Sequence, residues 1–584
     1  MKVSDYIADL LSKNTSVIFG GQGSSVIHLV DSIIKHKGLK FIPGQSEQGS
    51  SLAADAYYRV SGKVGVTIGT SGPGILNFLQ GMACSYFDSI PSLYIAGAPV
   101  TSHLRKDKRI RQIGFQEMEV QNMVKPITKY SCLIKNTHEI DYEFKKALDI
   151  AHNKRMGPVL VELPDDIQRS YMPNKKKIYL PIRLNKLKTS KLLNSKLKKT
   201  LYLLEQSKRP LLLLGNGIRL SKSVSIIKKF IKKYKIPYSC SWGIADLFKT
   251  NDKLNAGSFG VAATRYGNFT LQKADLIFCI GTRLGTQAVG GDPKKFSPNS
   301  KKILIDIDTN EFNSQRLPKI DIKISSSIKP FISQMFTKKI KLKSKDINKW
   351  IKVINSLKKD YPILSKKNYT NKKFVDPYYF FKTLSQYVKN NSVLIPDASA
   401  NLIWTYQAFE INKNINMFTA FNHSPMGYSL AASVGAYFGN KKKMITAIIG
   451  DGSVPMNVQE LETIKNYSVN VKIFIINNRG YSLIKQTQET WLNSRYAGVD
   501  KSSGLSLPDN TKIAKSYGIK SLIIYNNDDL KKNLKKIYNL KGPLVIDVRI
   551  DPNARVAPKI DYGKPLHEMS PALSKNVIKE ILEK

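Results

Sequence analysis

The chain of 584 residues contains little cysteine, little histidine and few acidic residues. Its four cysteines, Cys84, Cys132, Cys240 and Cys279, lie far apart and form no Cys-x-x-Cys pair. This usage is typical of a reducing compartment and argues against a cysteine-bound metal cluster. No run approaches the roughly 18 uncharged apolar residues of a membrane-spanning helix. The N-terminal stretch MKVSDYIADLLSKN is typical of an amphipathic helix rather than of a signal peptide, so we expect a cytoplasmic protein without a membrane anchor.

The 44 acidic residues are outnumbered by 92 basic ones, which gives a formal net charge of +48. Only 16 of the basic residues are arginine, and the lysines form short runs scattered along the whole chain. A nucleic-acid-binding surface concentrates its charge and is rich in arginine and aromatic residues. The pattern therefore favours a lysine-biased composition over a polyanion site, and we expect no nucleic-acid partner. The excess positive charge would still attract anionic small molecules.

Apolar runs alternate with helical periodicity throughout the chain, which predicts α/β layers with parallel sheets. The runs fall into three groups, so we predict three doubly wound parallel-sheet domains at residues 1–180, 190–340 and 370–584. Two Lys-rich segments, 171–195 and 335–375, are expected to connect them. The strands are expected at VGVTIG, IPSLYIAGA, GPVLVELP, RPLLLLG, KIPYSCSW, ADLIFCIG, KKILIDID, SVLIPD, MITAIIG, VKIFIINN and GPLVIDVRI.

The sharpest motif lies in the third group, where the strand MITAIIG leads into Gly450-Asp451-Gly452-Ser453 and then a predicted helix, 456–466. The strand VKIFIINN later delivers Asn478. Glycines allow the backbone to approach a phosphate closely, and a following helix presents free N–H groups to it. A carboxylate and an amide oxygen on adjacent strand ends suit Mg²⁺ that also takes diphosphate oxygens. The alternative is a helix-capping aspartate and an unrelated turn, but the two motifs at this spacing favour the Mg²⁺ site.

A second candidate is Glu47, which follows the strand-like KFIPG and opens a helix of small residues, among them Ala53, Ala54 and Ala56. A carboxylate at a helix N-terminus is stabilised by the helix dipole, which is one interpretation. The other is a desolvated carboxylate that bonds a heterocycle nitrogen and shifts its protonation. Glu47 alone leaves both open.

Together these segments resemble the thiamine-diphosphate enzymes, and within them the acetolactate synthase-like (acetohydroxyacid synthase) group. The similarity extends over nearly the whole chain. It is carried by SEQGSSLAADAYYRVSGKVGVTIGTSGPG, DSIPSLYIAGAPV, GFQEMEVQNMVKPITKYS, GPVLVELPDDIQ, RPLLLLGNG, ADLIFCIGTR, KKILIDID and GDGSVPMNVQELETIKNYSVNVKIFIINNRG.

The resemblance implies an N-terminal pyrimidine-binding domain, a central domain and a C-terminal domain that binds diphosphate and Mg²⁺. Glu47 would bond N1′ of the cofactor's aminopyrimidine, and Met426 matches the bulky apolar residue that holds the cofactor bent. The Mg²⁺ ligands would be Asp451, Asn478 and the carbonyl of Gly480. The remaining cofactor-binding residues would be Pro73, Asn77, Asp397, Ala398, Ser399, Gly450, Gly452 and Ser453.

The resemblance also implies a catalytic role for Gln116. Phe115 and Gln116 match a Phe-Gln pair near the thiazolium ring, although Gln116 could also be a solvent-exposed loop residue. In the family, the glutamate and the diphosphate-binding half of one site come from different subunits. A homodimer or homotetramer with active sites at the subunit interface is therefore expected.

Three departures from the synthase pattern concern the acceptor substrate. Gln287 stands where synthases carry an arginine that clamps the acceptor carboxylate, and an amide offers no charge-assisted fork. Thr487 stands where they carry a tryptophan, with Ile484 beside it. Asp165 replaces a lysine after GPVLVELP. The donor half of the site thus matches the family, while the acceptor half has been rebuilt.

Two further features are left open by the sequence. His423 lies in the unusual segment FNHSPMG, where it could contact substrate or act as an acid or base, or could be a packing or surface histidine. Arg283 and Asp306 match positions near the flavin in FAD-carrying members, but such residues also occur where FAD is absent. FAD is therefore an open alternative beside thiamine diphosphate and Mg²⁺.

We predict an enzyme that decarboxylates a 2-oxoacid, with pyruvate as the first candidate, and transfers the two-carbon unit to a carbonyl acceptor such as a keto sugar. The alternatives are an acetolactate synthase catalytic subunit that joins two pyruvates and a simple 2-oxoacid decarboxylase. A non-catalytic binding protein is disfavoured, because Glu47, Asp451 and Asn478 are all present.

Overall fold

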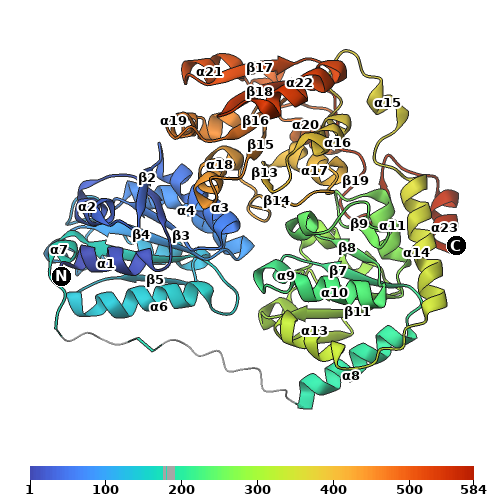
Figure 1. The fold of residues 1–584 in the computed structure, drawn as a ribbon, viewed down its shortest axis with the longest axis horizontal. Coiled ribbons are helices and arrows are strands. Elements are labelled where there is room, and N and C mark those ends of the chain that lie inside the picture. The colour runs from blue at the N-terminus through green and yellow to red at the C-terminus, as the bar shows by residue number, and fades with distance from the viewer. Residues whose placement is uncertain (175–178, 181–190, 584) are drawn as a thin grey trace.

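The computed structural model describes residues 1–174, 179–180 and 191–583, and it contains three six-stranded parallel sheets. Figure 1 shows them as three α/β units, the N-terminal one in blue, the central one in green and the C-terminal one in orange to red. Helices flank each sheet, so the predicted fold class is confirmed. Each of the predicted apolar runs forms a strand.

The N-terminal sheet has the strand order β2-β1-β3-β4-β6-β5. Its central strands are buried along their whole length because helices cover both faces, which explains their continuous apolar sequence. The strands are β1 Val17–Gly20, β2 Lys40–Pro43, β3 Gly65–Gly69, β4 Ser92–Ala98, β5 Tyr130–Leu133 and β6 Val159–Pro164. The helices are α1 Val3–Ser12, α2 Ile27–Lys35, α3 Glu47–Ser61, α4 Pro73–Asp88, α5 Val120–Val124, α6 Ile140–His152 and α7 Asp165–Arg169.

The central sheet has the order β12-β11-β10-β7-β8-β9, which is the order of Rossmann-type sheets. In such sheets ligands bind beyond the carboxyl ends of the strands, where the order reverses, here between β7 and β10. The strands are β7 Pro210–Leu214, β8 Tyr238–Cys240, β9 Asn255–Ser258, β10 Leu276–Ile280, β11 Lys301–Asp306 and β12 Ile322–Ser325. The helices are α8 Lys191–Gln206, α9 Gly217–Leu220, α10 Val224–Tyr234, α11 Arg265–Lys273, α12 Thr286–Val289, α13 Ile328–Phe336 and α14 Ser344–Asp360.

The C-terminal sheet, β14-β13-β15-β16-β18-β17, repeats the strand order of the N-terminal sheet. After it, a short antiparallel pair, β19 Lys559–Ile560 and β20 Met569–Ser570, and α23 Lys575–Glu583 return to the central domain (Figure 1). The strands of the sheet are β13 Ser392–Pro396, β14 Ile415–Met417, β15 Ile445–Gly450, β16 Val471–Asn477, β17 Lys520–Ile524 and β18 Leu544–Arg549. Its helices are α15 Lys366–Tyr369, α16 Pro377–Tyr387, α17 Ser399–Ala408, α18 Tyr428–Gly439, α19 Glu460–Asn466, α20 Ser482–Trp491, α21 Asn510–Ser516 and α22 Asn527–Asn539.

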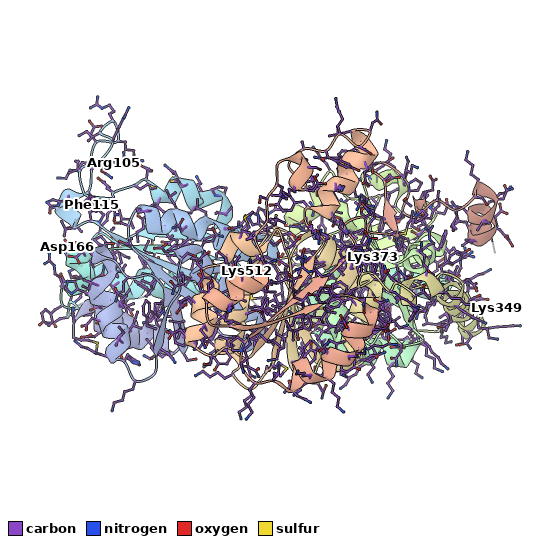
Figure 2. All side chains as sticks on the ribbon, turned by 90° about the horizontal axis from the view of Figure 1, so that it is seen from above. Arg105, Phe115, Asp166, Lys349, Lys373 and Lys512 are labelled. Atoms are coloured by element: carbon purple, nitrogen blue, oxygen red, sulfur yellow. The ribbon has the colours of Figure 1, made fainter. Side chains whose placement is uncertain are left out.

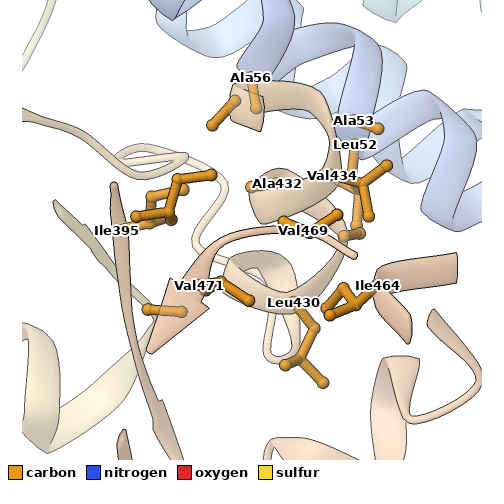
Figure 3. Packing of buried hydrophobic residues seen from close by; sticks show 14 of the residues in the cluster. Leu52, Ala53, Ala56, Ile395, Leu430, Ala432, Val434, Ile464, Val469 and Val471 are labelled. Carbon is orange, nitrogen blue, oxygen red and sulfur yellow. The ribbon is translucent and has the colours of Figure 1, made fainter. Parts of the chain in front are cut away.

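The N-terminal and C-terminal domains share one hydrophobic core, built where α3 packs on α18. Figure 3 shows Leu52, Ala53 and Ala56 of α3 against Val434 of α18. The helices approach closely because α18 carries Gly435, where a Cβ atom would lie 1.9 Å from the carbonyl oxygen of Ala53. This contact fixes the N-termini of both helices, and with them the residues that the sequence predicts as a site.

The two predicted connectors are partly helical. Segment 171–195 lies partly outside the described residues, and its last residues begin α8, which buries Leu193 and Leu197. Segment 335–375 contains α14, where Trp350 is buried and donates a 3.1 Å hydrogen bond to the Pro210 carbonyl. Both segments thus contain helices, because apolar residues at helical spacing decide burial even where lysines dominate the composition.

No helix among the described residues is long and apolar enough to cross a membrane. All four cysteines are free thiols. The lysines are spread widely, and Figure 2 shows Lys349, Lys373 and Lys512 on three separate parts of the surface.

Candidate active site

The turn after β15 holds the buried carboxylate that the sequence singled out. Oδ1 of Asp451 accepts a 2.9 Å hydrogen bond from the amide of Gly452, and Oδ2 accepts a 3.2 Å bond from the amide of Gly480. Only 3% of Asp451 is exposed, and this burial raises its pKa to about 7. The ends of β15 and β16 thus meet through this carboxylate, as the sequence predicts.

The two asparagines at the end of β16 have different environments. The amide of Asn477 donates a 3.0 Å bond to Asp547, so it is used within the sheet. Oδ1 of Asn478 is buried and has no hydrogen-bond partner in the described part of the chain. An unpaired buried amide oxygen near a buried carboxylate fits the oxygen ligands that Mg²⁺ takes. The described residues include no group of three or more His, Cys, Asp or Glu side chains placed for a metal, so an ion here would also need amide, backbone or cofactor oxygens as ligands.

The two glycines of the turn differ in what they allow. A Cβ atom on Gly452 would lie 2.1 Å from the ring of Tyr481, so this position requires glycine for packing. A Cβ atom on Gly450 would meet nothing closer than 3.6 Å, the amide of Asn401. Oδ1 of Asn401 is also buried without a partner among the described residues. Asn401 is therefore a polar residue at this turn that the sequence analysis missed, although it lies just after the predicted Asp397-Ala398-Ser399.

The predicted segment after β13 lies next to Met426. The fully buried Asp397 accepts 3.0 Å bonds from the amides of Gly427 and Ser429, so it fixes the residues that directly follow Met426. Burial raises the pKa of Asp397, and these amides together with the Ser453 side chain oppose the shift. Ala398 is buried, whereas Ser399 is exposed and has a φ of +70° at the start of α17.

A second group of predicted residues lies on the N-terminal domain. Nδ2 of Asn77 donates a 3.0 Å bond to Oε2 of the half-buried Glu47. Pro73 is the first residue of α4 and Asn77 the fifth, and both are exposed. Gln116 has a φ of +60° and packs against the turn before α4, since a Cβ atom on Gly72 would lie 2.8 Å from its carbonyl oxygen.

Phe115 is 82% exposed, and Ile110 and Ile113 of the same loop are exposed as well, so the loop presents several apolar side chains together. Figure 2 shows Phe115 with Arg105 at the far end of the N-terminal domain, away from the C-terminal domain. The loop is nonetheless held in place, because Glu117 accepts bonds from the amides of Arg105 and Ile113. In the described part of the chain, no hydrogen bond or ion pair joins Glu47 or Asn77 to the residues around Asp451. The residues beside Glu47 do contact the C-terminal domain, because the amide of Ser46 donates a 3.2 Å bond to Oε1 of Glu460 and the Gln48 side chain donates a 3.4 Å bond to Asn457.

A third group lines a cavity of about 640 Å³ where the three domains meet. The cavity lies at the carboxyl ends of the central strands and contains the predicted Arg283, Gln287 and Asp306. Arg283 donates a 2.6 Å bond to Oδ1 of Asn422 from the C-terminal domain. Burial and the neighbouring Arg155 lower the pKa of Arg283, whereas burial raises the pKa of Asp306. The cavity has the size and position of a ligand site in a doubly wound sheet.

The remaining predicted residues lie outside the lining of this cavity. His423 stacks on Phe87 with the ring centroids 5.9 Å apart, and partial burial lowers its pKa. Ile484 is exposed on α20, and the hydroxyl of Thr487 donates to the carbonyl of Leu483 in the same helix. The three proposed acceptor-site departures are Gln287, Thr487 with Ile484 beside it, and Asp165, and of these residues only Gln287 lines the cavity.

Asp88 and Asn422 bond to each other at this junction, and neither was predicted as a site residue. Asp88, in the DSIP segment, accepts bonds from Arg59 and from the backbone of Phe421 and Asn422. Neither Asp88 nor Asn422 belongs to a local motif, and they are separated by more than half of the chain. The one feature of the sequence that pointed to Asp88 was that its segment, DSIP, is among those that resemble the thiamine-diphosphate enzymes.

Three models of known protein-domain families match successive parts of the chain. Residues 1–123 match the thiamine pyrophosphate enzyme N-terminal TPP binding domain, residues 197–335 the central domain and residues 397–548 the C-terminal TPP binding domain. The chain is 31% identical to the acetolactate synthase large subunit of Buchnera aphidicola subsp. Acyrthosiphon pisum, covering 96% of this chain and 97% of that protein. It is 30% identical to the acetolactate synthase large subunit of Lactococcus lactis, over 95% and 93%. The corresponding protein of Porphyra purpurea is 29% identical, over 94% and 92%.

Proposed function

The chain belongs to the thiamine pyrophosphate (thiamine diphosphate) enzyme family, and we propose that it decarboxylates pyruvate and transfers the two-carbon unit to a carbonyl acceptor. The observation that carries this proposal is the buried Asp451 with the unpaired Oδ1 of Asn478 near it, on the same chain as the Glu47–Asn77 pair. These are the two groups of side chains that such a cofactor needs at its diphosphate end and at its pyrimidine end.

Bound thiamine diphosphate supplies a carbon centre that accepts the electron pair released when a 2-oxoacid loses CO₂. Asp451, Asn478 and the Gly480 carbonyl would hold Mg²⁺ and, through it, the diphosphate. Asn77 donates a hydrogen bond to Oε2 of Glu47, whereas Oε1 accepts none from the described residues. Oε1 is thus the oxygen that would share a proton with the pyrimidine N1′.

We further propose that the working unit is at least a homodimer. Glu47, Pro73, Asn77, Phe115 and Gln116 would act with the Asp451 group of a second copy. Two facts support this arrangement: among the described residues no hydrogen bond joins Glu47 or Asn77 directly to the Asp451 group, and Phe115 is 82% exposed. A second copy would cover this large apolar side chain.

The acceptor we propose is a keto sugar. Gln287 offers neutral amide contacts in place of a cation, which suits a hydroxylated carbonyl compound better than a carboxylate. The alternative acceptor is a second pyruvate, because the relatives are named acetolactate synthase large subunits. A simple decarboxylase without an acceptor is the third option.

A second cofactor, FAD, is proposed for the central cavity. The cavity of about 640 Å³ lies beside the Rossmann-type strand reversal and contains Arg283, whose guanidinium forms no ion pair among the described residues. Such a cation suits a phosphate-bearing ligand. Absorption spectroscopy of the purified protein would detect a bound flavin directly.

The test of the main proposal is product analysis with carbon-labelled pyruvate, Mg²⁺ and thiamine diphosphate, with and without keto sugars. We expect slow release of labelled CO₂ from pyruvate alone and transfer of label to an added sugar. Rapid formation of acetolactate from pyruvate alone would favour the synthase alternative. Complete absence of labelled CO₂ would refute the proposed donor.

A further inference from the structure

We propose that Phe87 and Asp88, at the end of α4, form a clamp that positions the segment 421–427, and that Asp88 is thereby a positioning residue for the chemistry at Met426. The effect on catalysis rests on the proposed function, whereas the contacts of the clamp are present in the chain itself. Asp88 contacts neither the Mg²⁺ ligands nor the predicted cofactor-binding residues directly.

Most of the hydrogen bonds that the Asp88 carboxylate accepts come from the start of this segment. Oδ2 accepts a 2.9 Å bond from the amide of Phe421, and Oδ1 accepts bonds from the amide of Asn422 at 3.1 Å and from its side chain at 2.6 Å. The remaining bond, 2.8 Å, comes from Arg59, which also pairs with Asp55. The carboxylate is 5% exposed, so these bonds are made away from water and are correspondingly strong.

The other end of the segment is held by a second buried carboxylate. Asp397 accepts bonds from the amides of Gly427 and Ser429, immediately after Met426. The stretch between the two anchors has few internal restraints, among them a 2.7 Å bond from the amide of Ser424 to the carbonyl of Ala420. Loss of the Asp88 anchor would therefore release the segment from one side and allow Met426 to move.

Two more contacts converge on the same residues. Phe87 stacks on His423, with an interplanar angle of 19°. Arg283 of the central domain donates to Asn422, whose amide group also bonds Asp88. All three domains thus meet at residues 421–423. If Asp88 served only to pair with Arg59, none of these contacts would be needed.

The clamp predicts a specific effect of Asp88→Asn. The variant keeps the side-chain volume and loses the charge that accepts the Phe421 and Asn422 amides, and a hydrogen bond to a charged group is worth about a tenfold change in an equilibrium. We expect the amides of Phe421 and Asn422 to exchange hydrogen for deuterium about tenfold faster. We expect kcat to fall about tenfold or more, while the Kd for thiamine diphosphate with Mg²⁺ changes less than about threefold.

The matched control is Asp141→Asn, because Asp141 is also 5% exposed and lies in the same domain, where it pairs with Lys145. We expect this control to leave exchange at residues 421–422 and kcat unchanged. Equal exchange in the two variants would overturn the clamp. Faster exchange in Asp88→Asn with an unchanged kcat would overturn the positioning role.

A second variant, Asn422→Ala, tests the clamp if Asp88→Asn does not fold. It removes the side-chain bonds of Asn422 to Asp88, to the Phe87 carbonyl and from Arg283, and leaves both backbone bonds to Asp88 in place. With the side chain no longer tied to Asp88, exchange of the same two amides should still be faster. Unchanged exchange in this variant would overturn the clamp. The exchange measurement uses the full chain without cofactor or substrate, so an enzyme inactive on pyruvate would refute the proposed function and leave this test intact.

Discussion

Asn77 and Glu47 form a hydrogen-bonded pair, 3.0 Å between Nδ2 and Oε2, that joins the N-terminal ends of two consecutive helices, α4 and α3. The pair leaves Oε1 of the glutamate facing Gly21 and Gly74, since Cβ atoms at these positions would lie 3.1 and 3.8 Å from it. The glycines keep large side chains away from this oxygen. The arrangement orients one carboxylate oxygen for a partner that must be flat and close, such as a heterocycle nitrogen.

Replacing Glu47 with Gln should therefore slow turnover while preserving cofactor binding. The amide keeps the size of the side chain but cannot hold a proton for N1′, and loss of a general acid–base group typically costs about 10²–10⁴-fold in rate. CO₂ release from pyruvate and calorimetric titration of thiamine diphosphate would measure the two effects. The control Glu139→Gln changes a carboxylate that binds turn amides on the same domain and should leave both unchanged. Unaltered turnover in Glu47→Gln would refute the role.

The two asparagines at the end of β16 provide a matched test of the metal site. Asn478→Ala and Asp451→Ala should each lower the affinity for Mg²⁺ and thiamine diphosphate together, because each removes a predicted Mg²⁺ ligand. Asn477→Ala should leave both affinities nearly unchanged, since the Asn477 amide is bonded to Asp547. Titration of each variant with Mg²⁺ at a fixed cofactor concentration measures the difference. Equal losses in Asn477→Ala and Asn478→Ala would contradict the assignment.

A mixture of two inactive variants can test the proposed shared site. A dimer that combines a Glu47→Gln chain with an Asp451→Ala chain has one site in which both residues are native, if each site uses two chains. Coexpression and separation by two affinity tags should therefore restore up to about half of the native activity, because one of two sites is intact. A site built within a single chain would give no recovery, and that result would refute the shared arrangement.

Much of this site could be predicted from the sequence because its parts are local. Asp451 and Asn478 each follow an apolar strand, and Glu47 opens the helix after β2, so strand-end logic places all three. The Asp88–Asn422 contact could not be found this way, because no local pattern links α4 to the loop before α18. The helix in the Lys-rich segment 344–360 was missed for a different reason: its lysines determined the composition, while Trp350 and its apolar neighbours determined the burial.

A buried glutamate in the N-terminal domain should make stability depend on pH. Glu162 is 5% exposed in β6, Oε1 accepts a 2.7 Å bond from Gln121, and burial raises its pKa to about 7. The ordinary pKa is about 4.3, so between these values the folded chain binds a proton that the unfolded chain has released. The contribution of Glu162 to the free energy of unfolding therefore falls by roughly 2–4 kcal/mol as the pH rises through this range. Above pH 7 it levels off.

Glu162→Gln should remove this dependence, since the amide does not titrate and can still accept from Gln121. Thermal unfolding at pH 5 and pH 8 would show a smaller difference in midpoint for the variant than for the native chain. Glu583→Gln, at an exposed carboxylate, serves as the control and should retain the native difference. If the midpoint difference between pH 5 and pH 8 in Glu162→Gln were as large as in the native chain, the prediction would be contradicted.

The acceptor proposal makes its sharpest prediction at Gln287, whose side chain is exposed in the cavity while its carbonyl accepts a 2.9 Å bond from the amide of Val261. The backbone bond survives substitution, so Gln287→Arg should fold normally and add a second cation to the cavity of Arg283. A guanidinium binds a carboxylate through two parallel bonds, whereas an ammonium acts as a point charge. Acetolactate formed from pyruvate alone should therefore rise about tenfold in Gln287→Arg and less in the control Gln287→Lys, as measured by product analysis with labelled pyruvate. Because transfer to a keto sugar relies on neutral contacts, it should not rise in either variant. An Arg variant that makes no more acetolactate than the native enzyme would show that Gln287 does not select the acceptor.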